Sequence, residues 1–351
     1  MKTRFSAKII AFAFMASSIF FFSCKKDETP PTPANSQVEI LPGNGVFITN
    51  EGNFQQGNAK LSYYFYSGTA YEDIFQPVNN RPLGDVCQSM AFIGSYAYVV
   101  VNNSGKIEVI RPIDAQSVKT ITGLSSPREI LAVSSSKAYV TDLFSGSISI
   151  INLSNDSISG SISLPGWTEA MKLLNNEVFV CNAGKNNLYV IDPATDQVTD
   201  SIAIAPGANS IISDLNGKLW VLCFGDYFTS TPGGLYRIDP STHLVEQAYP
   251  FTTSDYPTRL CANGTGDTLY YINTGVYRMP VASASLPSSA FLTPSGTQSF
   301  YGLNVQPQTG EIFVADAQDY SAKGHLLRFT RNGVLLADKM VGVAPAGIYF
   351  Y

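Results

Sequence analysis

The sequence has few of the residues on which several common functions depend. Its 351 residues include only two histidines, His243 and His325, which excludes a multi-histidine metal centre. Charged residues make up 14% of the chain, and 22 Lys and Arg against 27 Asp and Glu give a formal net charge of −5. That balance offers no basic surface for nucleic acid. We therefore predict no metal, no cofactor and no nucleic-acid partner.

Cysteine is also sparse, and its spacing carries no CxxC or metal-binding pattern. Apart from Cys24, the chain has Cys87, Cys181, Cys223 and Cys261. Two of these, Cys181 and Cys261, lie inside apolar runs, where a free cysteine behaves as a small hydrophobic residue. We predict structural thiols, and pairing in an exported protein remains the alternative.

No segment carries a sustained helical period, whereas aromatic residues are abundant. The sequence is 45% hydrophobic, with 19 Tyr and 21 Phe. Aromatic and β-branched side chains fit the half-buried surface of a pleated sheet. The composition therefore predicts a large all-β fold.

The N-terminus has the pattern of a targeting segment. Lys2, Arg4 and Lys8 precede the apolar run 9–22, which is too short to span a bilayer comfortably. The run ends in Phe-Phe-Ser-Cys24, which resembles the lipobox of bacterial lipoproteins, although Phe21 replaces the usual Leu. The resemblance implies a signal peptide over 1–23 and lipidation of Cys24, and a secreted protein without lipid is the alternative. A proline-rich tether over 24–40 then precedes the folded domain, 41–351.

A repeat of about forty residues organises that domain. The stretch 127–164 holds four short apolar runs separated by turn residues, and 167–204 repeats the same order. Tyr139 corresponds to Phe179 and Asp142 to Asn182. Four strands at this period are typical of a β-propeller blade.

The second strand of each unit is the clearest marker, because it is centred on an aromatic residue. Successive aromatics are separated by 51, 41, 40, 41, 50 and 43 positions, which predicts seven blades with insertions in surface loops. The seven runs are Val46–Asn50, Ala97–Val101, Ala138–Asp142, Val178–Asn182, Leu219–Cys223, Leu269–Asn273 and Ile312–Asp316.

The two ends of the domain complement each other. The first unit begins at its second strand, and an additional first strand follows the seventh unit at Pro345–Tyr351. We predict that this C-terminal strand joins the N-terminal blade and closes the ring, which removes an exposed sheet edge.

In a propeller, the loops from strand four to strand one and from strand two to strand three share one face. Here these loops carry aromatic, amide and charged residues, which suit a large planar ligand with a polar periphery. The candidate ligand-binding residues are Glu51, Asn53, Phe54, Asn102, Asn103, Arg128, Glu129, Phe144, Trp167, Glu169, Asn209, Asp226, Tyr227, Phe228, Tyr256, Arg259, Tyr301, Asp319 and Tyr320.

Structural roles compete with binding for some polar residues. An Asn or Asp ends the second strand in five units, which favours capping of the following turn. Glu129 and Glu169 recur at forty residues, and without a histidine or metal cluster beside them we expect a structural polar ring rather than catalysis. For Trp167, Phe228 and Tyr320, which break the repeat, binding and core packing remain open.

The runs 137–152 and 177–193 resemble the YncE-like, surface-layer-type seven-bladed propellers, and the resemblance covers 46–351. Together with the lipoprotein-like start, the chain is similar to propeller lipoproteins of Bacteroidetes, among them BtuG-type proteins. This resemblance implies capture of cobalamin or another corrinoid, transfer to a TonB-dependent outer-membrane transporter, and a lipid anchor in the outer membrane that leaves the domain facing outward.

Two other classes of function compete with this one. A glycan- or protein-binding surface module needs the same aromatic loops. A propeller enzyme, such as a lactonase or a quinoprotein dehydrogenase, is disfavoured by the scarcity of histidine. We therefore expect a binding protein, not an enzyme, with no catalytic residue.

Overall fold

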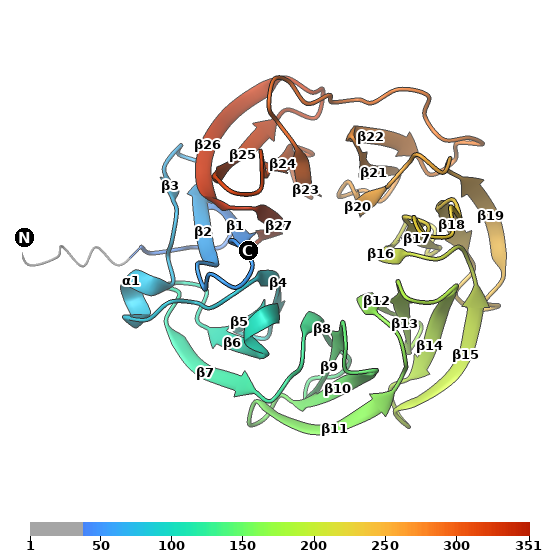
Figure 1. The fold of residues 1–351 in the computed structure, drawn as a ribbon, viewed down its shortest axis with the longest axis horizontal. Helices are drawn as coiled ribbons and strands as arrows, with labels where there is room; N and C mark the ends of the chain where they lie inside the picture. The colour runs from blue at the N-terminus through green and yellow to red at the C-terminus, as the bar shows by residue number, and fades with distance from the viewer. Residues whose placement is uncertain (1–37) are drawn as a thin grey trace, which may run out of the picture. The chain divides into compact units, whose positions relative to one another are not determined.

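Seven antiparallel sheets are arranged radially around a central axis (Figure 1). The computed structural model describes residues 38–351, and the predicted signal segment, Cys24 and most of the predicted tether lie outside them. The predicted all-β, seven-bladed propeller is confirmed. No helix among the described residues is long and apolar enough to cross a membrane.

Each sheet is one blade, and the innermost strands of neighbouring blades contact one another around the axis. From the innermost strand outward, the blades are: blade 1, β27 (Pro345–Phe350), β1 (Gly45–Asn50), β2 (Lys60–Phe65) and β3 (Ala70–Tyr71); blade 2, β4 (Cys87–Ile93), β5 (Tyr96–Val101), β6 (Lys106–Ile110) and β7 (Ser117–Thr122); blade 3, β8 (Pro127–Ala132), β9 (Lys137–Asp142), β10 (Ser147–Asn152) and β11 (Ser157–Ser163); blade 4, β12 (Thr168–Leu174), β13 (Glu177–Asn182), β14 (Asn187–Asp192) and β15 (Gln197–Ala203); blade 5, β16 (Ala208–Ser213), β17 (Leu219–Cys223), β18 (Gly234–Ile238) and β19 (Val245–Pro250); blade 6, β20 (Thr258–Ala262), β21 (Thr268–Asn273) and β22 (Gly275–Pro280); and blade 7, β23 (Phe300–Val305), β24 (Ile312–Asp316), β25 (Lys323–Phe329) and β26 (Leu335–Val343).

Blade 6 departs from the four-strand unit. Its outer position is taken by an irregular segment in which Leu292 forms an isolated bridge with Val276. Pro287 and Pro294 lie in that segment, and a proline cannot donate a ladder hydrogen bond. The two helical elements are short: α1 (Gln76–Asn79) and the 3-10 turn η1 (Asn102–Ser104).

The aromatic residue at the centre of each second strand is buried between blades. Phe47 is fully buried and packs with Met90, Ala97 and Val99 of blade 2. Trp220 of blade 5 packs with Leu260 and other residues of blade 6 in the same way. The marker aromatics therefore recur because each one fills the space between two sheets.

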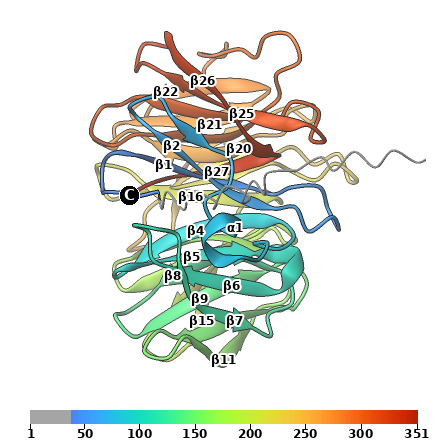
Figure 2. The same ribbon diagram turned by 90° about the vertical axis from the view of Figure 1, so that its left-hand side faces the viewer.

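Ring closure follows the prediction from the sequence. β27 pairs antiparallel with β1, with Ile48 opposite Ile348, and the two strands lie side by side in Figure 2. Ile348 is buried with Val46 and Phe313, so the closing strand joins the packing of blades 1 and 7. The C-terminal strand therefore completes a sheet and also an interface between blades.

In four of the five blades, the Asn or Asp that ends the second strand accepts a backbone N–H of a neighbouring loop, which confirms the turn-capping interpretation there. Asn50 is the exception, because its side-chain amide donates within its own sheet. Asp142 Oδ1 accepts hydrogen bonds from the backbone N–H groups of Phe144 (2.9 Å) and Ser145 (2.7 Å). Its Oδ2 accepts one from the N–H of Ser126, which leads into β8 (2.7 Å). Asp316 does the same for Ser299, which leads into β23 (2.7 Å). These carboxylates therefore fix the chain just before the inner strand begins.

Truncating Ile348 tests the closing strand. Ile348→Ala should lower the free energy of unfolding by about 2–4 kcal/mol, because a buried side chain leaves a cavity. The matched change Ile158→Ala, on the half-exposed outer strand β11, should cost less than about 1 kcal/mol. Urea unfolding measures both values. Deleting residues 347–351 should destabilise the ring further, and an unchanged melting temperature after that deletion contradicts the closure.

Candidate functional site

The inner strands of all seven blades begin at the same face of the ring, which we call the funnel face. A cavity of about 370 Å³ opens there. It continues into a central cavity of about 310 Å³, and Glu129, Asn209, Ser210 and Arg259 line both. The propeller axis is therefore hollow, and its mouth is polar. We call the upper cavity the funnel.

A β-bulge at the start of every inner strand builds the funnel wall. In blade 2, Cys87 pairs with Val101 and Ser89 with Val100, so Gln88 has no partner in the neighbouring strand. The register shifts at the same place in the other blades. Bulges re-aim side chains, and they recur next to functional sites. The first bulged residues are Gln88, Arg128, Glu169, Asn209, Arg259, Tyr301 and Ala346.

This register corrects one equivalence expected from the forty-residue spacing. Pro127 pairs with Asp142 and Thr168 pairs with Asn182, so Arg128, not Glu129, is the equivalent of Glu169. The two inner strands are offset by 41 positions and the second strands by 40, because the turns that follow the inner strands differ in length. The expected equivalence of Glu129 and Glu169 is therefore wrong, and the residue equivalent to Glu169, Arg128, forms an ion pair with it.

The ion pair joins blades 3 and 4. Arg128 Nη2 lies 2.7 Å from Glu169 Oε1, and the Arg128 Nη1 group donates to Gln88 Oε1 of blade 2 at 2.5 Å. Trp167 Nε1 also donates to Glu169 Oε1. The guanidinium centre lies 5.9 Å from the Trp167 ring. Three blades are thus linked by one buried, hydrogen-bonded arginine.

Arg259 also lies in the funnel wall but, unlike Arg128, forms no ion pair with the described residues. Its Nε–H donates to the carbonyl oxygen of Tyr301 at 3.0 Å, and its guanidinium lies 5.2 Å from the Tyr301 ring. The Tyr301 hydroxyl in turn donates to Glu51 Oε1 at 3.0 Å. Within residues 38–351, the terminal nitrogens of Arg259 have no hydrogen bond or ion pair. Arg259 also has a φ of +60°, a strained backbone conformation of the kind that collects at functional sites.

Glu129 lies where the funnel meets the central cavity, and its carboxyl group has no hydrogen bond or ion pair to the described residues. Burial, and to a smaller extent the charge of Glu169, raise the pKa of this carboxyl to about 7, although Arg259 and Arg128 oppose the shift. Burial also raises the pKa of Glu51. The funnel therefore combines one unpaired guanidinium with two carboxyl groups whose pKa values are raised, that of Glu129 to about 7.

Aromatic side chains form one side of the funnel. The rings of Phe224 and Tyr256 stack with centroids 4.6 Å apart, and Trp167 lies 6.0 Å from Phe224. Around the mouth, further aromatics are exposed to solvent, with Phe144 77%, Tyr227 83% and Phe228 95% accessible. Exposed apolar groups gathered on one face mark a surface that contacts a ligand or partner.

The structure brings most of the candidate residues from the sequence into this one cavity. The funnel is lined by Glu51, Phe54, Asn102, Arg128, Glu129, Trp167, Glu169, Asn209, Tyr256, Arg259 and Tyr301. The other candidates lie in surrounding loops: Asn53, Asn103, Phe144, Asp226, Tyr227, Phe228, Asp319 and Tyr320. Ligand binding by either group stays a prediction.

The candidates in the surrounding loops differ in whether their side chains are already bound to other residues. Asp226 and Asp319 cap their own loops, since Asp226 Oδ1 accepts the N–H of Phe228 at 2.9 Å and Asp319 Oδ1 that of Ser321 at 2.9 Å. The side-chain amide of Asn103 donates to Asp85 Oδ2 at 2.6 Å. That of Asn53 donates to the Tyr320 carbonyl at 3.3 Å. Exposed aromatics are the part of this group that remains free to contact a ligand.

Several lining residues were not predicted from the sequence. Gln88 occupies the same bulge position as Arg128. Aligning the inner strands of the blades by their pairing register would have identified it as a lining residue. Phe224 directly follows the second strand of blade 5, the position that Glu51 has in blade 1. The missed residues are Gly52, Val86, Gln88, Ser210, Phe224 and Thr258.

All four cysteines of the described residues are free thiols, and one of them, Cys261, lines the central cavity below the funnel. Cys87, Cys181 and Cys223 are buried free thiols in strands, and burial raises their pKa. His243 lies on the face opposite the funnel, where its ring nitrogens contact Asp200 (2.7 Å) and Glu177 (3.1 Å). Among residues 38–351, no group of three His, Cys, Asp or Glu could hold a metal ion.

A seven-bladed propeller with a polar axial funnel is the class that this fold and cavity define. The chain belongs to the family described as "Domain of unknown function (DUF5074)", which matches residues 44–341. No curated protein matches the sequence significantly.

Solved structures resemble the chain in fold. A quinonprotein alcohol dehydrogenase-like protein from Bacteroides thetaiotaomicron has a TM-score of 0.69 at 14% identity, over 88% of this chain and 78% of that one. A putative 6-phosphogluconolactonase from Bacteroides fragilis has a TM-score of 0.63 at 12% identity, over 88% and 98%. The dihydro-heme d1 dehydrogenase NirN in complex with DHE has a TM-score of 0.59 at 11% identity, over 91% and 77%. At these identities the similarity concerns the fold alone.

Glu129 should make stability depend on pH. In the folded state its carboxyl binds a proton more tightly than in the unfolded chain, so stability falls as pH rises between about 4.5 and 7. Glu129→Gln removes this loss. Urea unfolding should show the variant about 3 kcal/mol more stable than wild type at pH 8 and nearly equal to it at pH 4.5. A difference of the same size at both pH values contradicts the assignment.

Proposed function

We propose that the funnel face captures a large amphipathic small molecule, and that this ligand is a corrinoid such as cobalamin. The observation that carries the proposal is the combination of a polar funnel with solvent-exposed aromatic residues around its mouth. Such a surface suits a wide ring with an apolar face and polar substituents at its edge.

The proposed binding mode follows from size and polarity. A whole corrinoid has a larger volume than the funnel of about 370 Å³, so its ring lies across the mouth, where Phe54 and Tyr256 are exposed. Its peripheral amide groups carry both a carbonyl and an N–H. The carbonyl of one such group accepts a hydrogen bond from the unpaired nitrogens of Arg259, and the N–H of another donates to Glu129.

Rigidity supports tight capture. The Arg128–Glu169 pair and the capping carboxylates hold the funnel wall in place without a ligand. A preformed site loses little conformational entropy on binding. The funnel thus captures the ligand, and none of its residues is given a catalytic role.

The cellular setting is part of the same proposal. We infer that lipidation at Cys24 anchors the protein in the outer membrane, with the propeller facing outward, and that the ligand then passes to a TonB-dependent transporter. The lipobox-like sequence supports the anchor.

Calorimetric titration of residues 37–351, which form one compact unit, with cyanocobalamin tests the proposal. We expect saturable binding at micromolar concentration or tighter, with one site per chain. Arg259→Gln and Tyr256→Ala should each weaken binding about tenfold or more, because each removes a direct contact.

A matched control is Tyr96→Ala. Tyr96 is also an exposed tyrosine, but it lies at the start of β5, on the face opposite the funnel, and its loss should leave the affinity unchanged. Absence of heat and of co-migrating absorbance at micromolar concentration contradicts the corrinoid assignment. In that case, a surface module for glycans or proteins replaces it.

A further inference from the structure

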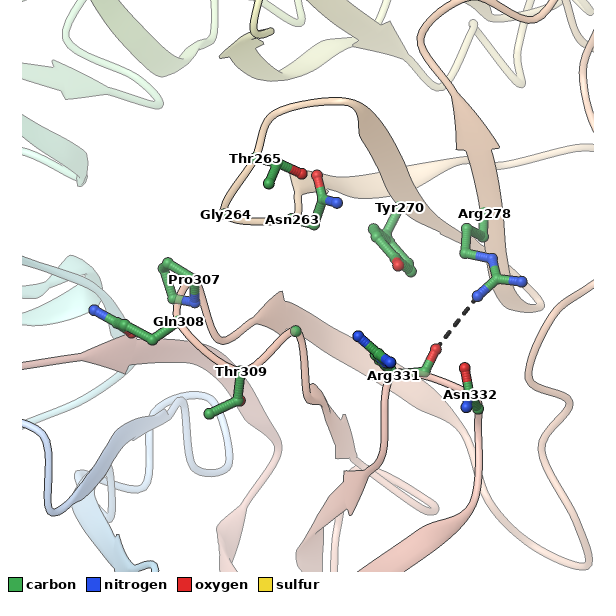
Figure 3. A pocket seen from close by; sticks show the side chains of 11 residues that line it. Asn263, Gly264, Thr265, Tyr270, Arg278, Pro307, Gln308, Thr309, Arg331 and Asn332 are labelled. Atoms are coloured by element: carbon green, nitrogen blue, oxygen red, sulfur yellow. Dashed lines mark hydrogen bonds between the residues drawn. The ribbon is translucent and has the colours of Figure 1, made fainter.

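A second hollow, of about 340 Å³, lies between blades 6 and 7 on the face opposite the funnel (Figure 3). Three turns form it: β20–β21, β23–β24 and β25–β26. All three join strand one to strand two or strand three to strand four, which places them away from the funnel. The hollow is therefore independent of the site described above.

The walls of this hollow are fixed by contacts between the turns. A Cβ atom on Gly264 would collide with the carbonyl oxygen of Pro307, so the first two turns touch through their backbones. Gln306 Oε1 accepts the N–H groups of Gln308 (2.6 Å) and Thr309 (3.0 Å), which holds the second turn. The hollow is thus a formed feature of the fold.

Two arginines face this space without a counter-charge. Arg278 lies over the Phe291 ring at 3.9 Å, and its Nη1 group donates to the carbonyl oxygen of Arg331 at 3.3 Å. Figure 3 shows the Arg331 side chain on the same side of the hollow as Tyr270 and Arg278. No Asp or Glu lines the hollow, and neither arginine forms an ion pair within residues 38–351.

Arg278 and Arg331 differ from most arginines of the described residues in having no carboxylate partner. The chain has a net charge of −5, and elsewhere most of its arginines lie against carboxylates, as Arg328 does against Glu311 at 2.8 Å. Both side chains are exposed, so water screens their mutual repulsion, and an anion between them would be attracted by both charges. Guanidinium groups bind phosphate and sulfate oxygens with paired N–H groups.

Neutral polar groups complete the lining. Thr265, Gln308, Thr309 and Asn332 carry hydroxyl and amide groups and also line the hollow, and Figure 3 shows the Tyr270 ring near the two arginines, with the Gln308 side chain directed away from them. Such groups hydrogen-bond to the hydroxyls of a sugar. A cavity of this size accommodates a small ligand rather than a bare ion alone.

We propose that this hollow binds a phosphate or sulfate monoester carried on a hydroxyl-rich group, with Arg278 and Arg331 holding the oxyanion. Arg331, whose side chain makes no hydrogen bond to the described residues, gives the cleanest test, because its replacement removes no side-chain hydrogen bond of the fold. Arg278 has a structural contact with Phe291, so its variant is secondary.

Calorimetric titration of residues 37–351 with glucose 6-phosphate, glucose 6-sulfate and glucose tests the site. We expect saturable binding of at least one charged ester and no binding of glucose. Arg331→Gln should weaken the affinity about tenfold or more. The affinity of Arg331→Lys should lie between that of wild type and that of Arg331→Gln, because lysine keeps the charge but lacks the planar guanidinium fork.

Two controls separate binding in this hollow from nonspecific attraction of anions and from binding in the funnel. Lys119→Gln removes one exposed positive charge on β7 and should leave the affinity unchanged. Arg259→Gln, in the funnel, should also leave it unchanged. The proposal is overturned if neither ester binds, if Lys119→Gln weakens binding as much as Arg331→Gln, or if the Arg259 variant alone abolishes binding. Phosphate and sulfate esters of equal affinity support a general oxyanion site, and unequal affinities identify the preferred ester.

Discussion

The funnel depends on one recurrent constraint, the β-bulge that opens every inner strand. In each blade the end of the second strand pairs with the first residue of the inner strand, and the next residue of the inner strand is left unpaired. Where a capping carboxylate such as Asp142 or Asp316 is present, it also fixes the preceding loop. The side chain of this unpaired residue therefore points out of the sheet and lines the axial cavity. A repeated backbone irregularity thus converts seven scaffold units into one site.

The residues at the bulge positions fall into two electrostatic states. Arg128 and Glu169 satisfy each other across a blade interface, so they stiffen the ring. Arg259 and Glu129 lie in the same funnel with unsatisfied polar atoms, and the strained backbone of Arg259 adds to that cost. Fold stability alone does not favour buried charges of this kind. The ligand recognition that we propose for the funnel would explain why they are present.

Much of the fold could be predicted because a blade carries its information locally. Aromatic residues such as Phe179 and Trp220 mark the second strands, and the unmatched segment at Pro345–Phe350 indicates closure. The details of the site were less accessible. A turn of different length shifts the inner strand by one position, so Arg128 rather than Glu129 matches Glu169. The pairing of Arg128 with Gln88 and Glu169 joins three blades, and no short sequence pattern encodes such contacts.

The most direct test of ligand capture at the funnel uses tryptophan fluorescence. The chain has only two tryptophans: Trp167 lies in the funnel wall, whereas Trp220 is fully buried between blades. We expect cyanocobalamin to quench the fluorescence of residues 37–351 saturably, and we expect Trp167→Phe to remove the larger part of that quenching. Equal saturable quenching in wild type and Trp167→Phe, or quenching that never saturates, would contradict a ligand site in the funnel.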